Sequence, residues 1–465
     1  MMRELDYDVA VIGAGTAGIA AYRAADAAGA RAVLIERGPG GTTCARVGCM
    51  PSKLLIAAGA AAHAARSTDL FGIRVSGVVV DGPAVLKRVR SERDRFVGGV
   101  FDGLDAIPEQ NRIAGHARFA DGRSLVIDDR TRIGFRAAVI ATGSSPIVPE
   151  PLRGLGARVL TTDTLFEIPN LPESLAILGA GAVGIEIAQA MARLGVAVTV
   201  INSGETVAGL SDPVLVQQAA KIFGAEMDLH LGAEVQAAAP DGAGVRIDWI
   251  DRDGCTHVTR AARVLAAAGR SPNLDDLGLD AAGLHPGQGG VPEFDSRSLV
   301  CQGGNILIAG DADALRPVLH EASRQGEIAG TNAAALAAGC PVTMPEPWPS
   351  LAMVFTHPQA AVIGAPYDAE AADRVVGEMD FSDQGRARVE GVNKGGIRIW
   401  ADRSGRLLGG EMLGPAVEHL AHLLIYVVAQ GLTVRSLGAW PTYHPTIEEG
   451  LKTALSDVER KICAC

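Results

Sequence analysis

Short apolar runs separated by glycine-rich turns open the chain. The run Val9–Ile12 leads into the turn Gly13–Gly18, an alanine-rich segment follows, and a second apolar run ends at Glu36. A short apolar run bounded by turn residues is typical of a strand, and an alanine-rich segment favours a helix. The pattern therefore predicts a strand, a turn, a helix and a second strand in that order.

The turn has the spacing Gly-x-Gly-x-x-Gly at Gly13, Gly15 and Gly18. These glycines permit a tight turn, a close approach of the backbone to a pyrophosphate, and close packing of helix on strand. Glu36 follows about 20 residues later, where an acid accepts hydrogen bonds from ribose hydroxyls. These four residues predict a dinucleotide-binding site.

The same pattern returns near the middle of the chain. The apolar run 174–178 leads into a second turn with glycines at Gly179, Gly181 and Gly184, followed by a helix through Leu194 and a strand at 196–201. Two such units imply two bound dinucleotides, or one dinucleotide and a duplicated scaffold. The cysteine pair described below makes two cofactors that pass electrons in series the simpler account.

The C-terminal part has a different pattern. Apolar and polar residues alternate in stretches such as 396–400 and 407–413, and helical patterns follow near 416–430 and 446–459. Strands first and helices afterwards indicate an α+β domain.

Composition narrows the class of protein. The 465 residues suffice for about three domains, and 48% are hydrophobic. The net charge of −11 argues against nucleic acid or an anionic membrane surface as a partner. No apolar run approaches the ~18 residues of a membrane span. Seven unevenly spaced cysteines suit a reducing cytoplasm with one working disulfide rather than a secreted scaffold.

Cys44 and Cys49 lie five positions apart, directly before Met50-Pro51-Ser52-Lys53. Near a helix start such a pair can close and reopen a disulfide, because the helix N-terminus favours the thiolate. A structural zinc site needs four ligands, usually in two close pairs, and no second pair lies nearby. The segment therefore predicts a redox-active pair and no metal site.

Four further motifs have a recognisable order: Ala141-Thr142-Gly143, Gly269-Arg270-Ser271-Pro272-Asn273, Ala309-Gly310-Asp311 and His444-Pro445-Thr446-Ile447-Glu448-Glu449. With them the chain resembles, nearly end to end, the class I pyridine nucleotide–disulfide oxidoreductases. This flavoprotein family includes dihydrolipoamide dehydrogenase, glutathione reductase and mercuric reductase. One departure is Gly41-Thr42-Thr43-Cys44, where the family commonly has a second glycine before the threonine.

The resemblance implies an α/β fold with two Rossmann-like domains and a C-terminal α+β dimerisation domain. The FAD domain is expected at 1–149 and 276–344, the NAD(P) domain at 150–275, and the dimerisation domain at 345–465.

The resemblance also assigns roles to the cysteines. It implies that Cys49 exchanges electrons with the flavin and that Cys44 exchanges with the substrate sulfur. A base that titrates near neutral pH is then needed, and His444 suits that role, with Glu449 fixing its imidazole. The family places this pair against Cys44 of the other subunit, which implies a homodimer with shared active sites.

Further family positions map onto this sequence. Lys53 and Glu186 are expected to pair beside the flavin, where a cation stabilises the electron density that the flavin gains. Thr43, Lys53, Thr142, Gly143 and Asp311 are expected to contact FAD. Gly269 is expected at the NAD(P) site.

The preferred nicotinamide coenzyme depends on the end of the second unit's last strand. An acid there is typical of NAD, and nearby arginines are typical of NADP. This chain has Asn202, and no lysine or arginine follows before Lys221. A 2′-phosphate would find no counter-charge in that segment, so NAD is favoured while NADP stays possible.

Three substrate hypotheses remain. The first is a dihydrolipoamide dehydrogenase-like oxidation of a small dithiol or lipoyl protein with NAD⁺. The second is an NAD(P)H-dependent reductase of another low-molecular-weight disulfide, with Arg23 placed to bind a substrate carboxylate. The third is mercuric-reductase-like handling of a metal ion by the C-terminal Cys463-Ala464-Cys465, since two thiolates suit a soft metal. The intact His444 weakens this third hypothesis, because mercuric reductases usually lack that histidine.

Overall fold

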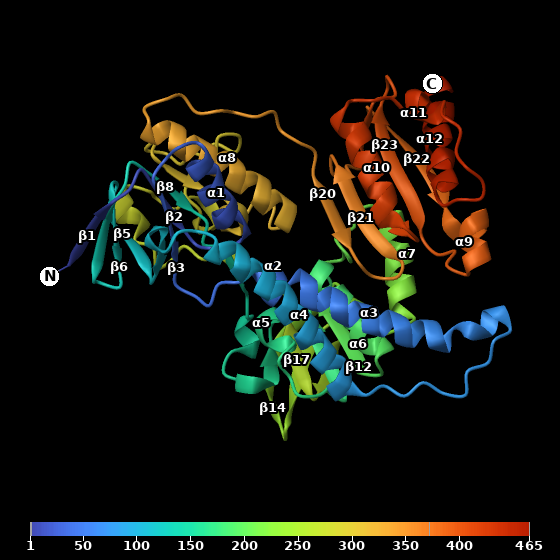
Figure 1. The fold of residues 1–465 in the computed structure, drawn as a ribbon. Helices are drawn as coiled ribbons and strands as arrows, with labels where there is room; N and C mark the ends of the chain where they lie inside the picture. The colour runs from blue at the N-terminus through green and yellow to red at the C-terminus, as the bar shows by residue number, and fades with distance from the viewer. Residues whose placement is uncertain (1, 372, 465) are drawn as a thin grey trace. The chain divides into compact units, whose positions relative to one another are not determined.

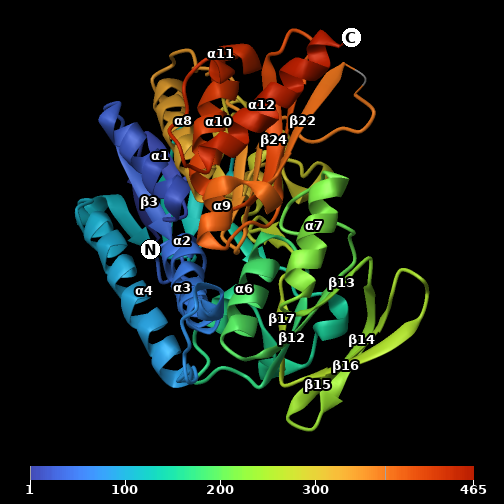
Figure 2. The same ribbon diagram turned by 90° about the vertical axis from the view of Figure 1, so that its right-hand side faces the viewer.

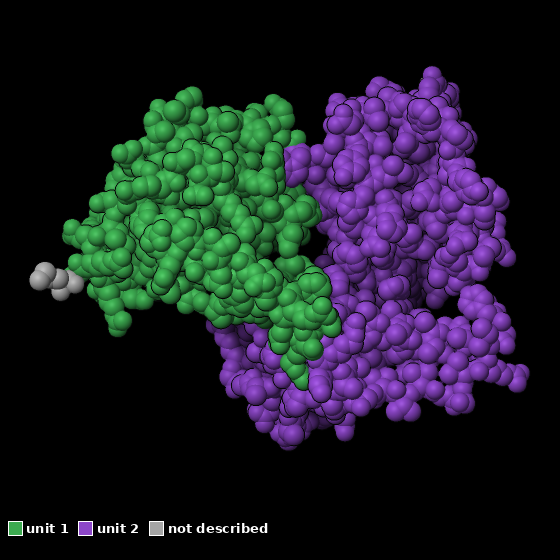
Figure 3. Space-filling view, viewed as in Figure 1, with its two compact units in different colours: residues 1–51, 90–147, 270–347 green, residues 52–89, 148–269, 348–465 purple. Residues whose placement is uncertain are grey.

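The computed structural model describes residues 2–371 and 373–464. They form two compact units, each assembled from three separate segments (Figure 3). Unit 1 comprises residues 1–51, 90–147 and 270–347, and unit 2 comprises residues 52–89, 148–269 and 348–465. The division into three domains expected from the sequence stays a prediction.

A parallel sheet forms the centre of unit 1. Its strand order is β19 (Ile306–Ile308), β8 (Ala137–Ile140), β2 (Val9–Ile12), β3 (Ala32–Glu36) and β4 (Arg112–Ala114). Every residue of β2, β8 and β19 is buried, as expected for strands covered on both faces. The first apolar run therefore forms the strand that the sequence predicts, and this strand is the middle one of the sheet.

Helices α1 (Thr16–Ala27) and α8 (Leu319–Ala337) pack closely together in unit 1. A Cβ at Gly326 or Gly330 of α8 would lie 2.3 or 2.1 Å from a backbone oxygen of α1. The two backbones thus touch directly, which only small residues allow. The longest helix among the described residues is the charged α4 (Gly82–Asp105) (Figure 1).

A second sheet and a short strand pair complete the strands of unit 1. The sheet has the order β1 (Arg3–Asp6), β7 (Thr131–Gly134), β6 (Ser124–Ile127) and β5 (Ala117–Asp121). The pair joins β9 (Ser144–Pro146) to β18 (Arg270–Pro272) in antiparallel register. It connects the points where the chain leaves unit 1 and returns to it.

Unit 2 repeats the parallel arrangement. The strand order is β10 (Val159–Leu160), β17 (Arg263–Ala266), β11 (Ser174–Leu178), β12 (Ala197–Asn202) and β13 (Asp228–Leu231). The helices beside it are α3 (Cys49–Arg66), α5 (Thr162–Leu165), α6 (Ala182–Arg193) and α7 (Pro213–Gly224). An antiparallel meander follows β13, with strands β14 (Glu234–Asp241), β15 (Gly244–Ile250) and β16 (Thr256–Ala261).

The last segment of unit 2 has strands first and helices afterwards, in agreement with the α+β pattern of the sequence. Its antiparallel sheet has the order β20 (Leu351–Val354), β21 (Gln359–Gly364), β24 (Leu407–Gly414), β23 (Gly396–Asp402) and β22 (Arg374–Asp380). Its helices are α9 (Gly385–Glu390), α10 (Val417–Ala429), α11 (Val434–Gly438) and α12 (Glu448–Cys463), of which α10 and α12 pack on the sheet (Figure 2).

The remaining helical turns are α2 (Thr43–Arg46) and eight short 3₁₀ segments: η1 (Thr68–Phe71), η2 (Glu109–Asn111), η3 (Glu150–Leu152), η4 (Gly156–Arg158), η5 (Leu279–Ala282), η6 (Gln288–Gly290), η7 (Gly310–Asp313) and η8 (Phe381–Asp383). Among the described residues, none of the helices is both long and apolar enough to span a membrane.

Candidate active site

The first glycine turn is built by contacts that exclude side chains. Gly13 has a φ of +104°, and a Cβ there would lie 2.3 Å from the Ala141 oxygen. A Cβ at Gly18 would lie 1.8 Å from the Gly13 oxygen. Gly15 differs, because its Cβ would meet no described atom within 4 Å. Gly13 and Gly18 therefore make the close contacts of the turn, and Gly15 leaves open space in front of it.

Glu36, at the end of β3, holds this turn. The Ala14 N–H donates to Glu36 Oε2 at 2.7 Å, and the Gly38 N–H donates to Oε1 at 2.7 Å. A carboxylate oxygen can accept more than one hydrogen bond, so Glu36 keeps acceptor capacity for ribose hydroxyls. Open space at Gly15 beside a carboxylate is what a dinucleotide requires.

Three predicted motifs meet in unit 1. Ser144, directly after Gly143, donates from Oγ to Asp311 Oδ2 at 2.7 Å and accepts from Arg270 Nε at 2.7 Å. The Asn273 side chain donates to the Thr142 carbonyl at 3.0 Å, and the Asn273 N–H donates to the Gly143 carbonyl at 2.9 Å. The segment that begins with Arg270 therefore fixes both the Thr142 turn and the Asp311 carboxylate.

Thr142 supplies a second sign that a ligand belongs here. Its Oγ1 is buried and has no hydrogen-bond partner among the described residues. A buried hydroxyl without a partner is costly, and a ligand oxygen or nitrogen would satisfy it. Together with Gly15 and Glu36, the residues of unit 1 fit FAD.

The redox segment forms two helices with a tight connection. Thr42 has a φ of 53°, and its Oγ1 accepts from the Ala45 N–H at 3.2 Å, which starts α2. A Cβ at Gly48 would lie 3.3 Å from Cys44 Cα, so the backbone directly before Cys49 packs on Cys44. Cys44 is partly buried, Cys49 is exposed as the first residue of α3, and Thr43 is exposed.

The second glycine turn repeats the geometry of the first. Gly179 has a φ of +111°, and a Cβ at Gly184 would lie 1.9 Å from its oxygen. A Cβ at Gly181 would again meet no described atom within 4 Å. Asn202, at the end of β12, accepts from the Ala180 N–H at 3.0 Å. The open Gly181 and the matching turn fit a second dinucleotide.

The Asn202 amide is engaged with the backbone. Its Nδ2 donates to the carbonyls of Gly204 at 2.6 Å and Thr206 at 3.2 Å. A primary amide has two N–H donors, so both are used within the protein. Only the oxygen keeps acceptor capacity, which suits a ribose hydroxyl better than a phosphate. Gly269, the other predicted NAD(P) residue, ends the second segment of unit 2 with a φ of +102°.

Lys53 and Glu186 form an ion pair. Lys53 Nζ lies 3.0 and 2.8 Å from the two Glu186 oxygens. The Glu186 side chain is 5% exposed and that of Lys53 is 34% exposed. Lys53 follows Cys49 by one turn of α3. The structure therefore brings together the two charged residues that the sequence pairs.

His444 and Glu449 are also in contact. His444 Nδ1 lies 3.0 and 3.2 Å from the two Glu449 oxygens, and the Thr446 N–H donates to Glu449 Oε2 at 3.1 Å. The hydrogen bond with His444, followed by that with Thr446, lowers the pKa of the Glu449 carboxyl. Nδ1 of the imidazole therefore faces the carboxylate, on a side chain that is 79% exposed.

Other predicted residues have more ordinary surroundings. Arg23 donates to the Gly103 carbonyl at 3.3 Å. Cys301 was given no role from the sequence, and burial raises the pKa of its thiol to about 12, which favours an inert thiol. Cys463 is exposed at the end of α12, and Cys465 lies outside the described residues.

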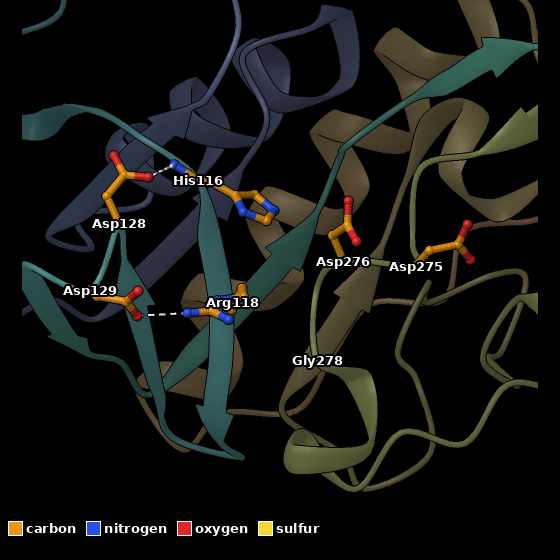
Figure 4. A pocket seen from close by; sticks show the side chains of 7 residues that line it. All are labelled: His116, Arg118, Asp128, Asp129, Asp275, Asp276 and Gly278. Carbon is orange, nitrogen blue, oxygen red and sulfur yellow. Dashed lines mark hydrogen bonds and ion pairs between the residues drawn. The ribbon is translucent and has the colours of Figure 1, made fainter.

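Unit 1 also has an open pocket. Its volume is about 500 Å³, and Figure 4 shows the side chains around it. They are His116, Arg118, Asp128, Asp129, Asp275 and Asp276, together with Gly278. Asp129 is paired with Arg118, and the Asp128 carboxylate accepts from the His116 N–H. None of the predicted site residues lines it.

Sequence reasoning missed Ser144 and Phe355 and gave Arg270 no role. Phe355, the residue after β20, donates its N–H to Glu186 Oε1 at 2.8 Å. Ser144 follows Ala141-Thr142-Gly143 directly, and Arg270 belongs to a quoted motif, so proximity in sequence could have identified both. Phe355 is far from Glu186 in the chain, and no pattern connects them.

Comparisons with known proteins agree with this arrangement. A family model described as pyridine nucleotide-disulphide oxidoreductase matches residues 7–326, and one for the dimerisation domain of the same family matches residues 350–455. The chain therefore belongs to the pyridine nucleotide-disulphide oxidoreductases. These proteins use FAD and a pyridine nucleotide, and the matched dimerisation domain suggests a homodimer.

Individual relatives divide between two activities. A dihydrolipoyl dehydrogenase of Halobacterium salinarum is 32% identical, over 96% of this chain and 95% of that protein. A mercuric reductase of Streptomyces lividans is 33% identical, over 98% of each. The particular activity is therefore not fixed by similarity.

Solved structures share the fold. LpdA from Mycobacterium tuberculosis has a TM-score of 0.82 and 25% identity, over 97% of this chain and 99% of that one. A Cu(II) complex of RclA from Escherichia coli, a HOCl-induced flavoprotein disulfide reductase, has a TM-score of 0.82 and 23% identity over the same shares.

Proposed function

We propose that this FAD-dependent oxidoreductase resembles dihydrolipoyl dehydrogenase in activity and oxidises a small dithiol with NAD⁺ through Cys44 and Cys49. The His444–Glu449 contact at 3.0 Å carries this proposal. A dithiol substrate needs a base for its thiols, and an imidazole fixed by a carboxylate is suited to that role. The cytoplasmic location expected from the cysteines stays a prediction.

The proposed chemistry is thiol–disulfide exchange. His444 takes a proton from one substrate thiol, and the resulting thiolate attacks Cys44 of a Cys44–Cys49 disulfide, so that Cys49 leaves as a thiolate. The second substrate thiol then displaces Cys44, which takes up a proton. The substrate loses two electrons as it becomes a disulfide, and the protein disulfide gains them as it becomes a dithiol.

The cofactors would be held by this chain's own groups. Bound FAD would take up the electron pair of the reduced cysteines, and NAD⁺ would accept it as hydride. Gly13, Gly15, Gly18 and Glu36 would bind FAD, together with Thr43, Lys53, Thr142, Gly143 and Asp311. Gly179, Gly181, Gly184, Asn202 and Gly269 would bind the pyridine nucleotide. Lys53, fixed by Glu186, would stabilise negative charge during electron transfer.

NAD is the proposed coenzyme because of Asn202. Its two N–H donors are used on Gly204 and Thr206, so it has no donor left for a 2′-phosphate. Its oxygen can still accept from a 2′-hydroxyl. Calorimetric titration with AMP and with 2′,5′-ADP tests this step directly: tighter binding of AMP is expected, and tighter binding of 2′,5′-ADP would contradict it.

Anaerobic turnover is the primary test. The FAD-loaded protein is mixed with dihydrolipoamide and either NAD⁺ or NADP⁺, and coenzyme reduction is followed. Fast NAD⁺-linked turnover is expected. Negligible turnover with both coenzymes, in protein whose flavin is still reduced by NADH, would exclude the lipoyl substrate.

The role of His444 has its own test. His444→Gln should lower dithiol turnover by roughly 10²–10⁴-fold, as expected for loss of a general base. Reduction of an artificial dye by NADH requires no thiol proton transfer, so it should stay near the wild-type rate. Equal losses in both assays would contradict the assignment of His444 as the base.

The last part of the proposal is that two subunits share each active site. The His444 side chain is 79% exposed, so it is accessible to a second subunit. Cys44→Ser and His444→Gln subunits are unfolded together and refolded as mixed dimers. If each site combines Cys44 of one subunit with His444 of the other, half of the dimers gain one intact site. About one quarter of wild-type turnover should then return, because a two-fold dimer has two equivalent sites. No recovery in mixed dimers would place both groups on one subunit.

The mercuric reductase relatives favour a second candidate, reduction of a soft metal ion with the C-terminal cysteines as ligands. Deleting Cys463-Ala464-Cys465 removes this pair, of which Cys463 is the last residue of α12. If the second candidate holds, Hg²⁺-dependent NAD(P)H oxidation is present and falls on deletion while dithiol turnover is unchanged. Absence of Hg²⁺-dependent oxidation in the full-length protein would remove this candidate.

A further inference from the structure

Glu186 is held from two directions in unit 2. Lys53 Nζ donates to both of its oxygens, and the Phe355 N–H donates to Oε1 at 2.8 Å. The Glu186 side chain is 5% exposed, so these donors compensate a nearly buried carboxylate. A main-chain donor cannot rotate away, and Phe355 therefore fixes where the Glu186 oxygens lie.

The side chain of Phe355 contacts the other member of the pair. Lys53 Nζ lies 4.7 Å from the centroid of the Phe355 ring. An ammonium at this distance over an aromatic face is attracted by the ring's negative charge density. One residue thus binds Glu186 with its backbone and Lys53 with its ring.

This double contact restrains a group that is flexible by nature. A lysine ammonium sits on a stem with four rotatable bonds and has three N–H donors. Two donors are used on Glu186, and the ring covers one side of the ammonium, so the remaining donor has a defined direction. The ring also keeps water from that side, which strengthens the field of the charge.

We propose that Phe355 is a positioning residue for Lys53 in the electron-transfer step. This inference rests on the proposed role of Lys53 beside the flavin. Phe355 belongs to the C-terminal segment that begins with β20, so this segment would contribute to electron transfer as well as to dimerisation. Phe355 acts through Lys53 and Glu186, and no contact with substrate or cofactor is assigned to it.

Phe355→Leu removes the ring and keeps the backbone N–H. The first measurement is the rate at which trace acetic anhydride acetylates Lys53, followed by mass spectrometry in protein without FAD. The rate is divided by that of the exposed Lys221 on α7 in the same sample, which cancels general loosening. Loss of a cation–π contact should raise this ratio about two- to fivefold.

The second measurement is anaerobic stopped-flow reduction of the bound flavin by NADH. Phe355→Leu should slow it about tenfold at saturating NADH, because misplacement of a charge at the reacting centre lowers the maximal rate rather than coenzyme binding. Phe355→Tyr keeps the ring and should restore both measurements. Tyr367→Leu is the matched control, since it removes an aromatic ring that packs edge-on against Trp400.

The outcomes separate this inference from the proposed function. An unchanged Lys53 ratio in Phe355→Leu overturns the positioning role, even if the enzyme oxidises dihydrolipoamide. A raised ratio with slow flavin reduction supports it, even if the wild-type protein has no dihydrolipoamide turnover. If Phe355→Leu does not fold, Phe355→Met replaces the ring with a side chain of similar volume, and the same two results decide.

Discussion

The two glycine turns of this chain have nearly the same backbone and different chemistry. Gly13 and Gly179 have φ values of +104° and +111°. A Cβ at the third glycine of each turn would lie 1.8 Å from the oxygen of the first glycine in unit 1 and 1.9 Å from it in unit 2. The same steric contacts therefore determine the backbone of both turns, and other residues determine which ligand each turn binds.

The residue that ends the second strand makes the first difference. Glu36 accepts two backbone N–H groups and keeps a full negative charge for ribose hydroxyls. Asn202 accepts one N–H, and both of its own N–H groups donate to carbonyls of the following loop. The same position thus holds the turn in both units, but only Glu36 offers a charged acceptor.

The helices after the turns make the second difference. α1 buries alanines, a glycine and Tyr22 and packs on α8. α6 instead buries Glu186, Gln189 and Arg193, and the latter two donate to the His357 carbonyl. The buried residues of α1 are therefore almost all apolar, whereas α6 buries three hydrogen-bonded polar side chains among its apolar ones.

The largest expected effect comes from filling the open space in each turn. Gly15→Val and Gly181→Val should both fold, because no described atom lies within 4 Å of the added Cβ. Gly15→Val should weaken FAD binding by about 100-fold, roughly 2.7 kcal/mol, and leave NADH binding intact. Gly181→Val should do the reverse. Flavin fluorescence and calorimetry measure the two dissociation constants.

Gly98→Val is the control for this pair, because Gly98 lies on α4 with equally open surroundings. It should bind both ligands as the wild type does. If Gly15→Val keeps FAD, or if Gly181→Val loses FAD, the assignment of one dinucleotide to each turn is wrong.

Intermediate effects are expected at the strand ends. Glu36→Gln removes one acceptor and the charge, so FAD should bind about 10- to 100-fold more weakly, in line with charged hydrogen bonds.

Asn202→Asp sets an oxygen against the Gly204 and Thr206 carbonyls, and both coenzymes should bind about three- to tenfold more weakly. NADPH should lose more than NADH, because the new charge repels its 2′-phosphate. Equal losses of NADH and NADPH would show that residue 202 does not contact this ribose.

The elements around these turns were accessible to sequence analysis. The strand expected at 396–400 is β23, the helix expected through Leu194 is α6, and the helix expected at 446–459 is α12. Apolar runs, alternation and glycine spacing are local signals, so they predict local structure. The expected ends were less accurate, as with α12, which extends to Cys463.

Contacts between distant segments were less accessible. The Lys53–Glu186 and His444–Glu449 pairs could be expected only because a family resemblance supplied them. The Phe355 contact with Glu186, and the relay from Arg270 through Ser144 to Asp311, are set by tertiary packing. Nothing in the local pattern marks an ordinary phenylalanine or serine as part of a site.

The last expected effect is on stability, and it concerns the residues that follow the outer strand of each parallel sheet. β10 is followed by Thr161, whose hydroxyl caps α5. β19 is followed by η7, where Asp313 is 3% exposed and accepts from the Leu315 N–H at 2.8 Å. Burial raises the pKa of Asp313 to about 6, and the nearby Asp311 and Glu321 add to this against opposing hydrogen bonds. Unit 1 thus carries a titrating group in the turn after its outer strand, whereas the residue directly after the outer strand of unit 2 is a neutral threonine.

The sign of its effect on stability follows from the raised pKa. An unfolded aspartate has a pKa near 3.9, so the stability linked to the protonated Asp313 is complete below about pH 4 and is lost as the pH rises through 6. Asp313→Asn keeps an acceptor for Leu315 and cannot ionise. At pH 8 it should be more stable than the wild type by about 3 kcal/mol, and the gain should vanish near pH 4. Thermal unfolding of the FAD-free protein at pH 4, 6 and 8, with the exposed Asp102→Asn as control, measures this. A difference that stays constant across this range would mean that Asp313 does not titrate on unfolding.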